Sequence, residues 1–555
     1  MAIEIEAIKR INIYEQDLTT AATTEDSLDV VYVPGLYGVN SIATEAGVEP
    51  PEGITGIIYQ DGWVKGDIFC NVADKKMWVC TKVKEISAET GDGESEPEET
   101  KVYQFEWDEV EYVEPLITDP ENYSDFTMLP PELFISTNRL KAKYGTHYVN
   151  YFDEDENSNI HDHILGDSLT YATELIKAGL PVVYHCGVKF EQASADDIDE
   201  DTDPSNDSDE NPEERDEAKT ITYYRMTATS ADLLDAIKDI DIDGGKFGAF
   251  RDVLDANELS VKFITTGAHS VVEIEEPASD DDKPKLTEDS VKLVTNLIGL
   301  ASARGDAVAF IDGLPEQSVV DDTSLFGVLC ESGPWTNGEY ATAFAPWAYY
   351  RTSNNTDVLL PGSFGYLTAY ANSIKTNGSA LAIAGVTRGV LPKLRSLSLQ
   401  PTEKLSNAIA DLWQNVNDTV ANVNGITYIR NYGYCIWGNR TLHDNSEESG
   451  SNGLVDTSFL SIRVMLCDLK KRLRNIAVRL LFEQNNDVLW GKFLFGVIPV
   501  LDRLKGIAAI SNYKVIHIPT NDKTKLKAVI KLVTVKPLEQ IEIGIVMVDD
   551  DVEVQ

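Results

Sequence analysis

Basic residues are scarce in this sequence. Its 555 residues include 47 Lys and Arg against 92 Asp and Glu, which leaves a formal net charge of -45. This charge repels phosphate backbones and anionic membrane surfaces, so we expect no nucleic-acid partner and no membrane insertion. The chain is nevertheless 43% apolar and 9% aromatic, which is too hydrophobic for a disordered acidic polymer. The composition predicts a folded acidic protein of about three or four domains whose partners are other proteins.

Cysteine is also rare, and no long hydrophobic run is present. The six cysteines have no CxxC pair and no histidine at metal spacing, which is typical of buried thiols in a reducing compartment: Cys70, Cys80, Cys186, Cys330, Cys435 and Cys467. No window approaches the roughly 18 uninterrupted apolar residues of a membrane span. The first residues lack the basic region and apolar core of a secretory signal. We therefore expect folding in a cytoplasm.

The common catalytic and cofactor motifs are missing as well. The sequence contains no GxxxxGK[ST], GxSxG or HExxH, and no GxGxxG at a strand-to-helix turn, so we expect no catalytic residue, cofactor or metal. His161-Asp162-His163 is the nearest approach to a metal pair, but no third ligand lies nearby in the sequence. Arg304-Gly305-Asp306 has the spelling of an adhesion motif, yet its place between a predicted helix and strand indicates a turn.

The charge is distributed unevenly along the chain. Residues 1–341 carry a net charge of -49, residues 342–540 carry +9, and the last fifteen residues add five acids and no base. Two acidic low-complexity runs, 85–100 and 196–217, predict solvated insertion loops. The second run is rich in oxygen ligands, but no window fits a calcium-binding loop. An acidic half and a basic half suit a subunit that assembles head to tail.

Hydrophobic patterning divides the chain into five expected parts. They are an N-terminal arm (1–29), a β-rich domain (30–135) with the acidic loop 85–100, an α/β domain (136–340) with an acidic insertion at 191–219, a C-terminal domain (341–540), and a C-terminal strand and acidic arm (541–555). Helix-then-strand patterns recur at 164–186, 230–267 and 288–315, and this alternation predicts a largely parallel sheet. Further on, the patterns predict helices at 402–423 and 457–482 and strands at 425–438, 513–518, 527–535 and 539–548.

The order of segments in the C-terminal half carries a family resemblance. Six segments carry it, in this order along the chain: SARGDAVAFIDGLP, YATAFAPWAYY, Pro-Gly-Ser at 361–363 with ALAIAGVTRG, NGITYIRNYGYCIWGNRTL, FLSIRVMLCDLKKRLRNIAVRLLFEQNNDVLW and KPLEQIEIGIVMV. In this order they resemble the sheath protein of contractile phage tails and related injection machines, over roughly residues 290–548. Asn439 departs from the alanine that the family usually has there, and LPKLRSL replaces its usual Trp and Ala-Pro-Asn.

The resemblance implies a structural role. It implies a mixed α/β, multidomain fold with a C-terminal sheath domain of mixed sheet and helices, β-rich inserted domains and extended arms at both ends. The implied subunit stacks as hexameric rings around an inner tail tube, meets baseplate and tail terminator or neck proteins, and contracts to drive the tube through a host cell envelope. The implied location is the virion, in the phage tail, after assembly in the host cytoplasm. The alternative is a sheath subunit of a phage-derived bacteriocin or secretion-type injection apparatus. Less favoured alternatives are an acidic hydrolase, an adhesin and a capsid subunit.

Two sets of residues are candidates for assembly. Alternating apolar residues in the arms could add strands to the sheet of a neighbouring subunit, or pair within their own sheet: Ile3, Ile5, Ile11, Ile13, Ile541, Ile543, Ile545 and Met547. The second set is a basic face on the helix from Thr457, off its apolar stripe: Arg463, Lys470, Lys471 and Arg474. Such a face is commonly just solvated, but in the family the corresponding helix approaches the tube, so these residues are expected to grip an acidic tube surface.

Overall fold

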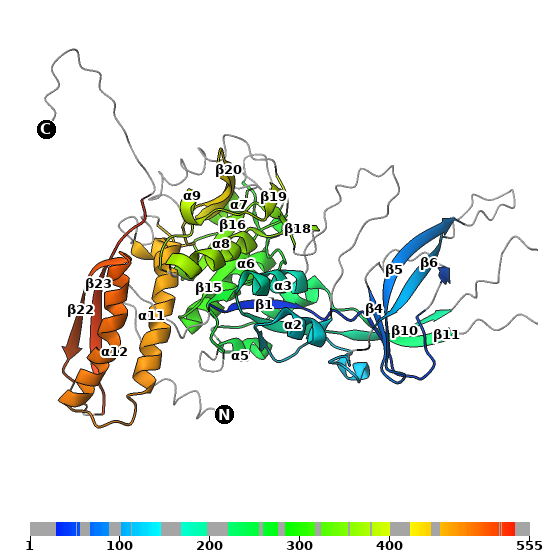
Figure 1. Cartoon of the computed structure of the whole chain (residues 1–555), viewed down its shortest axis with the longest axis horizontal. Coiled ribbons are helices and arrows are strands. Elements are labelled where there is room, and N and C mark those ends of the chain that lie inside the picture. The colour runs from blue at the N-terminus through cyan, green and yellow to red at the C-terminus, as the bar shows by residue number, and fades with distance from the viewer. Residues whose placement is uncertain are drawn as a thin grey trace, which may run out of the picture.

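The computed structural model describes a chain with three parts in a row (Figure 1): a β-rich lobe, a central body and an end module. The described residues are 29–50, 53–55, 67–87, 101–110, 112, 114–145, 168–196, 220–242, 244–254, 259–275, 283–315, 317, 324–352, 356–377, 380–399, 422–445, 455–520, 522 and 524–538.

A nine-stranded sheet forms the middle of the central body. The strand order is β21-β20-β16-β15-β12-β1-β9-β7, and β8 also pairs with β9. The strands are β1 (Val31–Leu36), β7 (Thr127–Met128), β8 (Glu132–Phe134), β9 (Val182–Val188), β12 (Phe263–Ile264), β15 (Val308–Asp312), β16 (Ala341–Ala345), β20 (Val423–Ile429) and β21 (Gly433–Trp437). All pairings from β9 through β1, β12, β15 and β16 to β20 are parallel, so the predicted parallel sheet is confirmed. The strands β9, β12, β15 and β16 are buried along their whole length, as expected for parallel strands that are covered on both faces.

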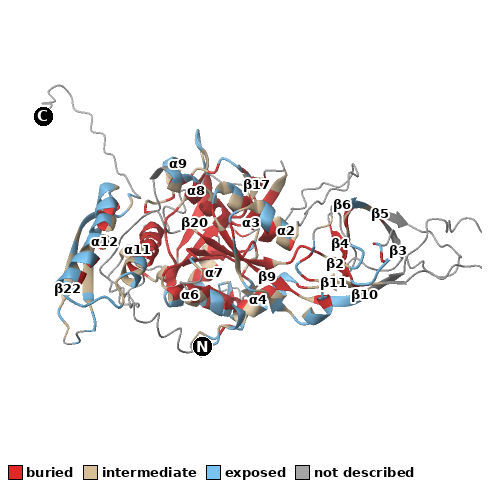
Figure 2. Cartoon of the chain, turned by 60° about the horizontal axis from the view of Figure 1, so that its bottom comes forward, coloured by how far each residue is buried: buried red, intermediate tan, exposed pale blue. Residues whose placement is uncertain are grey.

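Helices cover both faces of this sheet, as Figure 2 shows by the buried residues between them. Val31 and Val33 point to one face, which is packed by α2 (Thr137–Tyr144), α3 (Ser168–Ala178) and α8 (Gly362–Asn377). Val30 and Tyr32 point to the other face, which is packed by α4 (Ser230–Lys238), α5 (Arg251–Leu254), α6 (Glu288–Arg304) and α7 (Leu325–Glu331). This alternation follows from the two-residue period of a strand.

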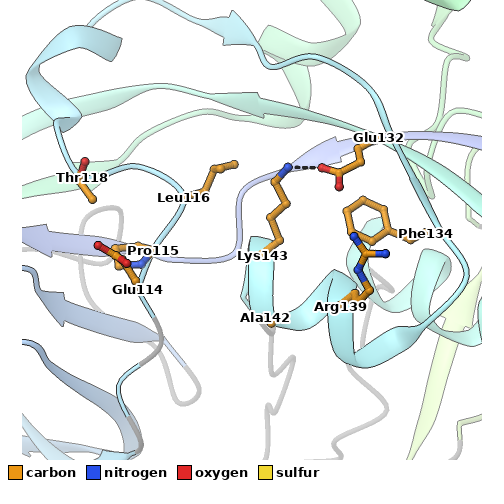
Figure 3. A pocket seen from close by; sticks show the side chains of 9 residues that line it. All are labelled: Glu114, Pro115, Leu116, Thr118, Glu132, Phe134, Arg139, Ala142 and Lys143. Atoms are coloured by element: carbon orange, nitrogen blue, oxygen red, sulfur yellow. Dashed lines mark hydrogen bonds and ion pairs between the residues drawn. The ribbon is translucent and has the colours of Figure 1, made fainter. Parts of the chain in front are cut away.

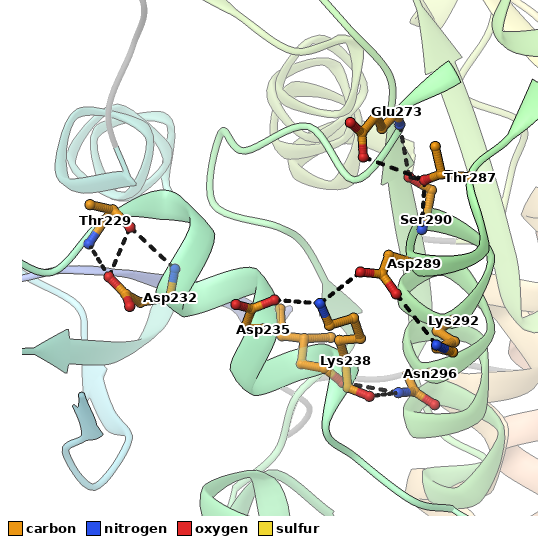
Figure 4. Close-up of polar contacts among 11 residues, drawn as sticks. Thr229, Asp232, Asp235, Lys238, Glu273, Thr287, Asp289, Ser290, Lys292 and Asn296 are labelled. Carbon is orange, nitrogen blue, oxygen red and sulfur yellow. Dashed lines mark hydrogen bonds and ion pairs between the residues drawn. The ribbon is translucent and has the colours of Figure 1, made fainter. Parts of the chain in front are cut away.

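Polar contacts fix α4 beside α6 (Figure 4). Thr229 and Asp232 form a capping box at the start of α4, and the Thr287 hydroxyl caps the start of α6. The side-chain amide of Asn296 on α6 lies 2.9–3.0 Å from the carbonyl oxygens of Ile237, Lys238 and Ile240, at and just after the end of α4. Lys238 adds ion pairs to a carboxylate on each helix. The two helices therefore cover their face of the sheet as a pair.

The β-rich lobe is a seven-stranded sheet in the order β10-β11-β2-β4-β5-β6-β3. Its strands are β2 (Ser41–Ala43), β3 (Gly53–Thr55), β4 (Ile68–Asn71), β5 (Lys76–Ser87), β6 (Lys101–Val110), β10 (Phe190–Asp196) and β11 (Thr220–Met226). Phe69 lies at the centre of a small aromatic core, in edge or tilted contact with Trp78, Trp107 and Tyr223. The chain enters this lobe after β1 and again after β9, so the lobe is an insertion into the central sheet.

The remaining elements are short or belong to the end module. The short ones are η1 (Pro120–Tyr123), η2 (Gly248–Phe250), β13 (Ile274–Glu275), β14 (Lys285–Leu286), η3 (Gly338–Tyr340), β17 (Ala348–Arg351), β18 (Asp357–Leu360), α9 (Gly385–Arg388) and β19 (Leu394–Leu397). The end module contains η6 (Asp456–Ser458), α11 (Leu460–Val478), α12 (Asp487–Gly506), β22 (Ile510–Ile518) and β23 (Lys527–Thr534).

The structure differs from the expected organisation in three places. The parts expected at 30–135, 136–340 and 341–540 share one sheet, because β1, β9 and β16 all lie in it. The strand expected at 425–438 is the hairpin β20–β21, which turns where Asn431 and Gly433 have positive φ. The helix α12 was not predicted. The expected helix at 402–423 lies largely outside the described residues, as do the two arms, most of both acidic runs and His161-Asp162-His163.

Two of the smaller expectations are confirmed. Arg304-Gly305-Asp306 is a turn: Gly305 ends α6 with a left-handed φ of 71°, and the Arg304 guanidinium pairs with the Asp306 carboxylate in the interior. All six cysteines are free thiols, of which five are buried and Cys330 is partly exposed.

Candidate functional site

The end module has its own hydrophobic core. The predicted apolar stripe of α11 is confirmed, because Ile462, Leu466, Leu469 and Leu473 pack against α12. On α12 the inward residues recur at helical spacing: Leu489, Phe493, Val497, Leu501 and Leu504. The sheet β22–β23 packs against the same core. Residues 456–534 thus form a layered unit joined to the central body through α11.

The basic face of α11 is turned toward the central body, which corrects the expectation of an outward face. The Arg463 side chain is 1% exposed, and its guanidinium carbon lies 4.1 Å from the centre of the Tyr340 ring. Lys471 is also buried and donates to the Val261 carbonyl at 2.8 Å. Neither charge is available to an external partner.

Lys470 and Arg474 are only partly buried. The Lys470 ammonium donates to the Tyr340 hydroxyl at 2.9 Å, and Arg474 lies 3.7 Å from the Asp306 carboxylate. The four basic residues therefore all contact the body: Arg463 and Lys470 contact the Tyr340 side chain, Lys471 contacts the Val261 backbone carbonyl, and Arg474 contacts the Asp306 side chain. For Lys470 and Arg474 the tube contact stays a prediction.

A buried lysine completes the attachment of α11. Lys262, in the segment before β12, is 1% exposed and lies 2.7 Å from Asp468 of α11 and 2.5 Å from Asp29. The Tyr370 hydroxyl of α8 lies 2.6 Å from Lys262 and 2.7 Å from Asp29. One ammonium group thus joins α11 to the point where the described chain begins.

The pKa shifts show how this cluster is balanced. Burial acts to lower the pKa of Lys262, but the charges of Asp29 and Asp468 outweigh it and raise that pKa above its usual value. Burial acts to raise the pKa of Asp29, and the Lys262 charge and hydrogen bond lower it instead. Lys471 lacks so close a carboxylate, and burial lowers its pKa to about 8. Lys262 and Asp29 therefore stay charged at neutral pH.

The side of α12 that faces away from the module's core exposes large apolar side chains, with the ion-paired Lys492 between two of them. Phe495 is 84% exposed and Val488 is 66% exposed, seven residues apart on one face, with Ile498 beside them. Phe482, in the turn between α11 and α12, is 90% exposed. Exposed apolar side chains gathered in this way make the surface a candidate for contact with a partner. This signal was present in the sequence as apolar residues all around α12.

Other features of the described residues offer no catalytic arrangement. The Ser168 hydroxyl lies 2.9 Å from His269 Nε2, the spacing of a nucleophile and its base, but it is buried and donates to the Gly267 carbonyl. An open groove of about 490 Å³ lies between residues 114–118 and α2 (Figure 3), and there Lys143 is paired with Glu132. No group of three His, Cys, Asp or Glu that could hold a metal ion occurs in the part of the chain that the structure describes.

No helix within the described ranges is long and apolar enough to cross a membrane. The arm residues named above, from Ile3 to Ile13 and from Ile541 to Met547, lie outside the described residues.

Comparison with known proteins gives distant structural likenesses. No family model and no curated protein matches the chain. A chain of the anti-feeding prophage (AFP) helical sheath in the contracted state has 11% identity and a TM-score of 0.41, with 98% of each chain covered. A chain of the AFP baseplate in the contracted state has 16% identity and a TM-score of 0.46, covering 77% of this chain and 91% of that one. A PVC sheath complex in the contracted state has 18% identity and a TM-score of 0.35, covering 46% and 68%.

The chain is therefore similar to sheath and baseplate chains of contractile injection systems.

Replacing Lys262 by Met should destabilise the protein strongly. The buried Asp468 carboxylate and the partly buried Asp29 carboxylate would lose their cation, and removing one partner of a buried ion pair typically costs about 3–5 kcal/mol. The matched control is Lys82→Met, which removes an exposed ion pair with Glu106 and should cost no more than about 1 kcal/mol. Urea unfolding followed by circular dichroism measures both variants. Equal unfolding midpoints for the two would show that the Lys262 cluster contributes little.

Proposed function

We propose that this chain is the structural subunit of a contractile sheath, which polymerises as stacked hexameric rings around an inner tube. The end module is the observation that carries the proposal. It is a packed unit at one end of the molecule (Figure 1), with an exposed apolar stripe on α12. The order of sequence segments that resembles phage-tail sheaths includes this module, which supports the same role.

The proposed subunit acts as a rigid body during contraction. The nine-stranded sheet and the buried ion pairs of α11 hold the central body and end module together, so subunits slide past one another while the arms keep them joined. The work comes from new contacts between subunits in a second packing. Contraction then drives the inner tube through a cell envelope. The same subunit would serve a phage tail or a phage-derived injection apparatus.

The α12 stripe is the surface that we assign to the inner tube. The basic face expected to grip the tube is turned inward at Arg463 and Lys471, whereas Val488 and Phe495 point away from the module's core. Lys470 and Arg474, at the junction with the body, are the remaining basic candidates for the same contact.

Electron microscopy of the purified chain tests the proposed function. We expect tubes of six-fold symmetry from the full chain. Deleting residues 1–20 or 549–555 should leave a folded protein, with unchanged circular dichroism, that forms no tubes, because the arms join neighbouring subunits. A full chain that stays a discrete small oligomer would contradict the sheath role, and normal tubes from either truncation would contradict the role of that arm.

Replacing Phe495 by Glu tests the tube contact separately. A carboxylate on the exposed α12 stripe should prevent co-assembly with the inner tube protein, while empty sheath tubes still form. Filled and empty tubes are counted in micrographs of the two proteins mixed. Exposed Val535, outside α12 on the same module, supplies the control Val535→Glu, which should leave filling unchanged. If Phe495→Glu gives the same fraction of filled tubes as the wild type, the assignment of the α12 stripe to the inner tube is wrong.

A further inference from the structure

The outer face of the sheet β22–β23 carries an unusual set of side chains. The cross-strand register places Lys514 opposite Lys531, Ile516 opposite Val529, and Ile518 opposite Lys527. The alternate residues, among them Val515 and Ile530, pack on the core of the end module. The six side chains of these three pairs, which we call the lysine face, are therefore turned away from α12, and Asn512 and Val533 lie opposite each other on the same side of the sheet.

Among the residues that the structure describes, no acid is paired with the lysine face. Neither strand contains Asp or Glu, and none of its three lysines makes an ion pair within the described residues. Like charges directly opposite on neighbouring strands destabilise a sheet, so the Lys514–Lys531 pair weakens the free protein. Nearby lysines are paired where an acid is in reach: Lys525 with Asp522 and Lys536 with Asp456.

The centre of this face is apolar. Ile516 and Val529 face each other between the lysines and are only half-buried. A surface with an apolar centre and charged flanks has the anatomy of a protein interface, with a polar rim around a hydrophobic patch. A partner that fits it presents apolar side chains flanked by carboxylates.

We propose that the lysine face binds the acidic surface of another copy of this chain. Residues 1–341 carry a net charge of -49, which supplies the complementary charge. In the β-rich lobe, β6 exposes Asp108 and Val110, two residues apart on one face of the strand, and that lobe lies at the opposite end of the molecule from β22 and β23 (Figure 1). A contact between two different surfaces of identical chains is head to tail, and such contacts build rings or open helical filaments. The contact rests on the proposed function, since it is one of the contacts of that polymer.

Charge reversal on the lysine face tests the contact in the purified full chain, where copies of the chain are the sole partners. Lys514→Glu with Lys531→Glu should raise the concentration at which polymers form by roughly tenfold or more at about 0.15 M salt, and wild-type assembly should weaken toward 1 M salt. Sedimentation and electron microscopy measure both. The control, Lys75→Glu with Lys246→Glu, changes the net charge equally at two exposed lysines outside this face and should assemble as wild type.

The conservative pair Lys514→Arg with Lys531→Arg should keep assembly, and circular dichroism should show every variant folded. Wild-type assembly of the Glu pair would overturn the contact. The Glu pair would assemble like the wild type if the lysines only prevented aggregation at the edge of the sheet, because Glu at an edge prevents aggregation as well. A wild type that neither polymerises nor self-associates would contradict both this contact and the sheath role. A wild type that polymerises alongside an unaffected Glu pair would contradict the contact alone.

Discussion

The ion cluster around Lys262 is the interaction on which the arrangement of the molecule depends. It joins Asp29 at the start of the described chain, the segment before β12 in the middle of the sheet, and Asp468 on α11. A buried ammonium between two carboxylates satisfies charges that would each be costly alone. Because the three partners come from distant parts of the sequence, the cluster fixes the direction in which the end module leaves the central body.

The orientation of α11 also decides which positive charges of the C-terminal half lie inside the molecule. The C-terminal half is net positive, yet much of that charge points inward: Arg463 and Lys471 are buried against the body. On the sheet of the end module, by contrast, Lys514, Lys527 and Lys531 are exposed. The α11 helix is thus a joint within the subunit, and the surfaces that face other proteins are α12 and the sheet beyond it.

The central sheet could be predicted from sequence because its signals are local. Apolar runs such as the one at β15, each after an amphipathic helix, are typical of buried parallel strands. The side to which α11 turns its basic residues could not be predicted, since periodicity tells which residues share a face and not what that face meets. The partners of Lys471 and Arg463, Val261 and Tyr340, are more than a hundred residues away. The helix α12 was missed because Phe495 and Val488 blur its apolar stripe and Pro499 interrupts it.

The inward orientation of α11 can be measured directly by the reactivity of lysine amines in the folded protein. Brief labelling with an amine-reactive ester, read out by peptide mass spectrometry, should modify Lys514 and Lys531 readily while Lys262 and Lys471 stay protected until urea unfolds the chain. Lys471 tests this most sharply, because it lies on the face of α11 that was expected to point outward, and its burial there should keep the reagent from its amine. Labelling of Lys471 as fast as Lys514 in the folded protein would contradict the account.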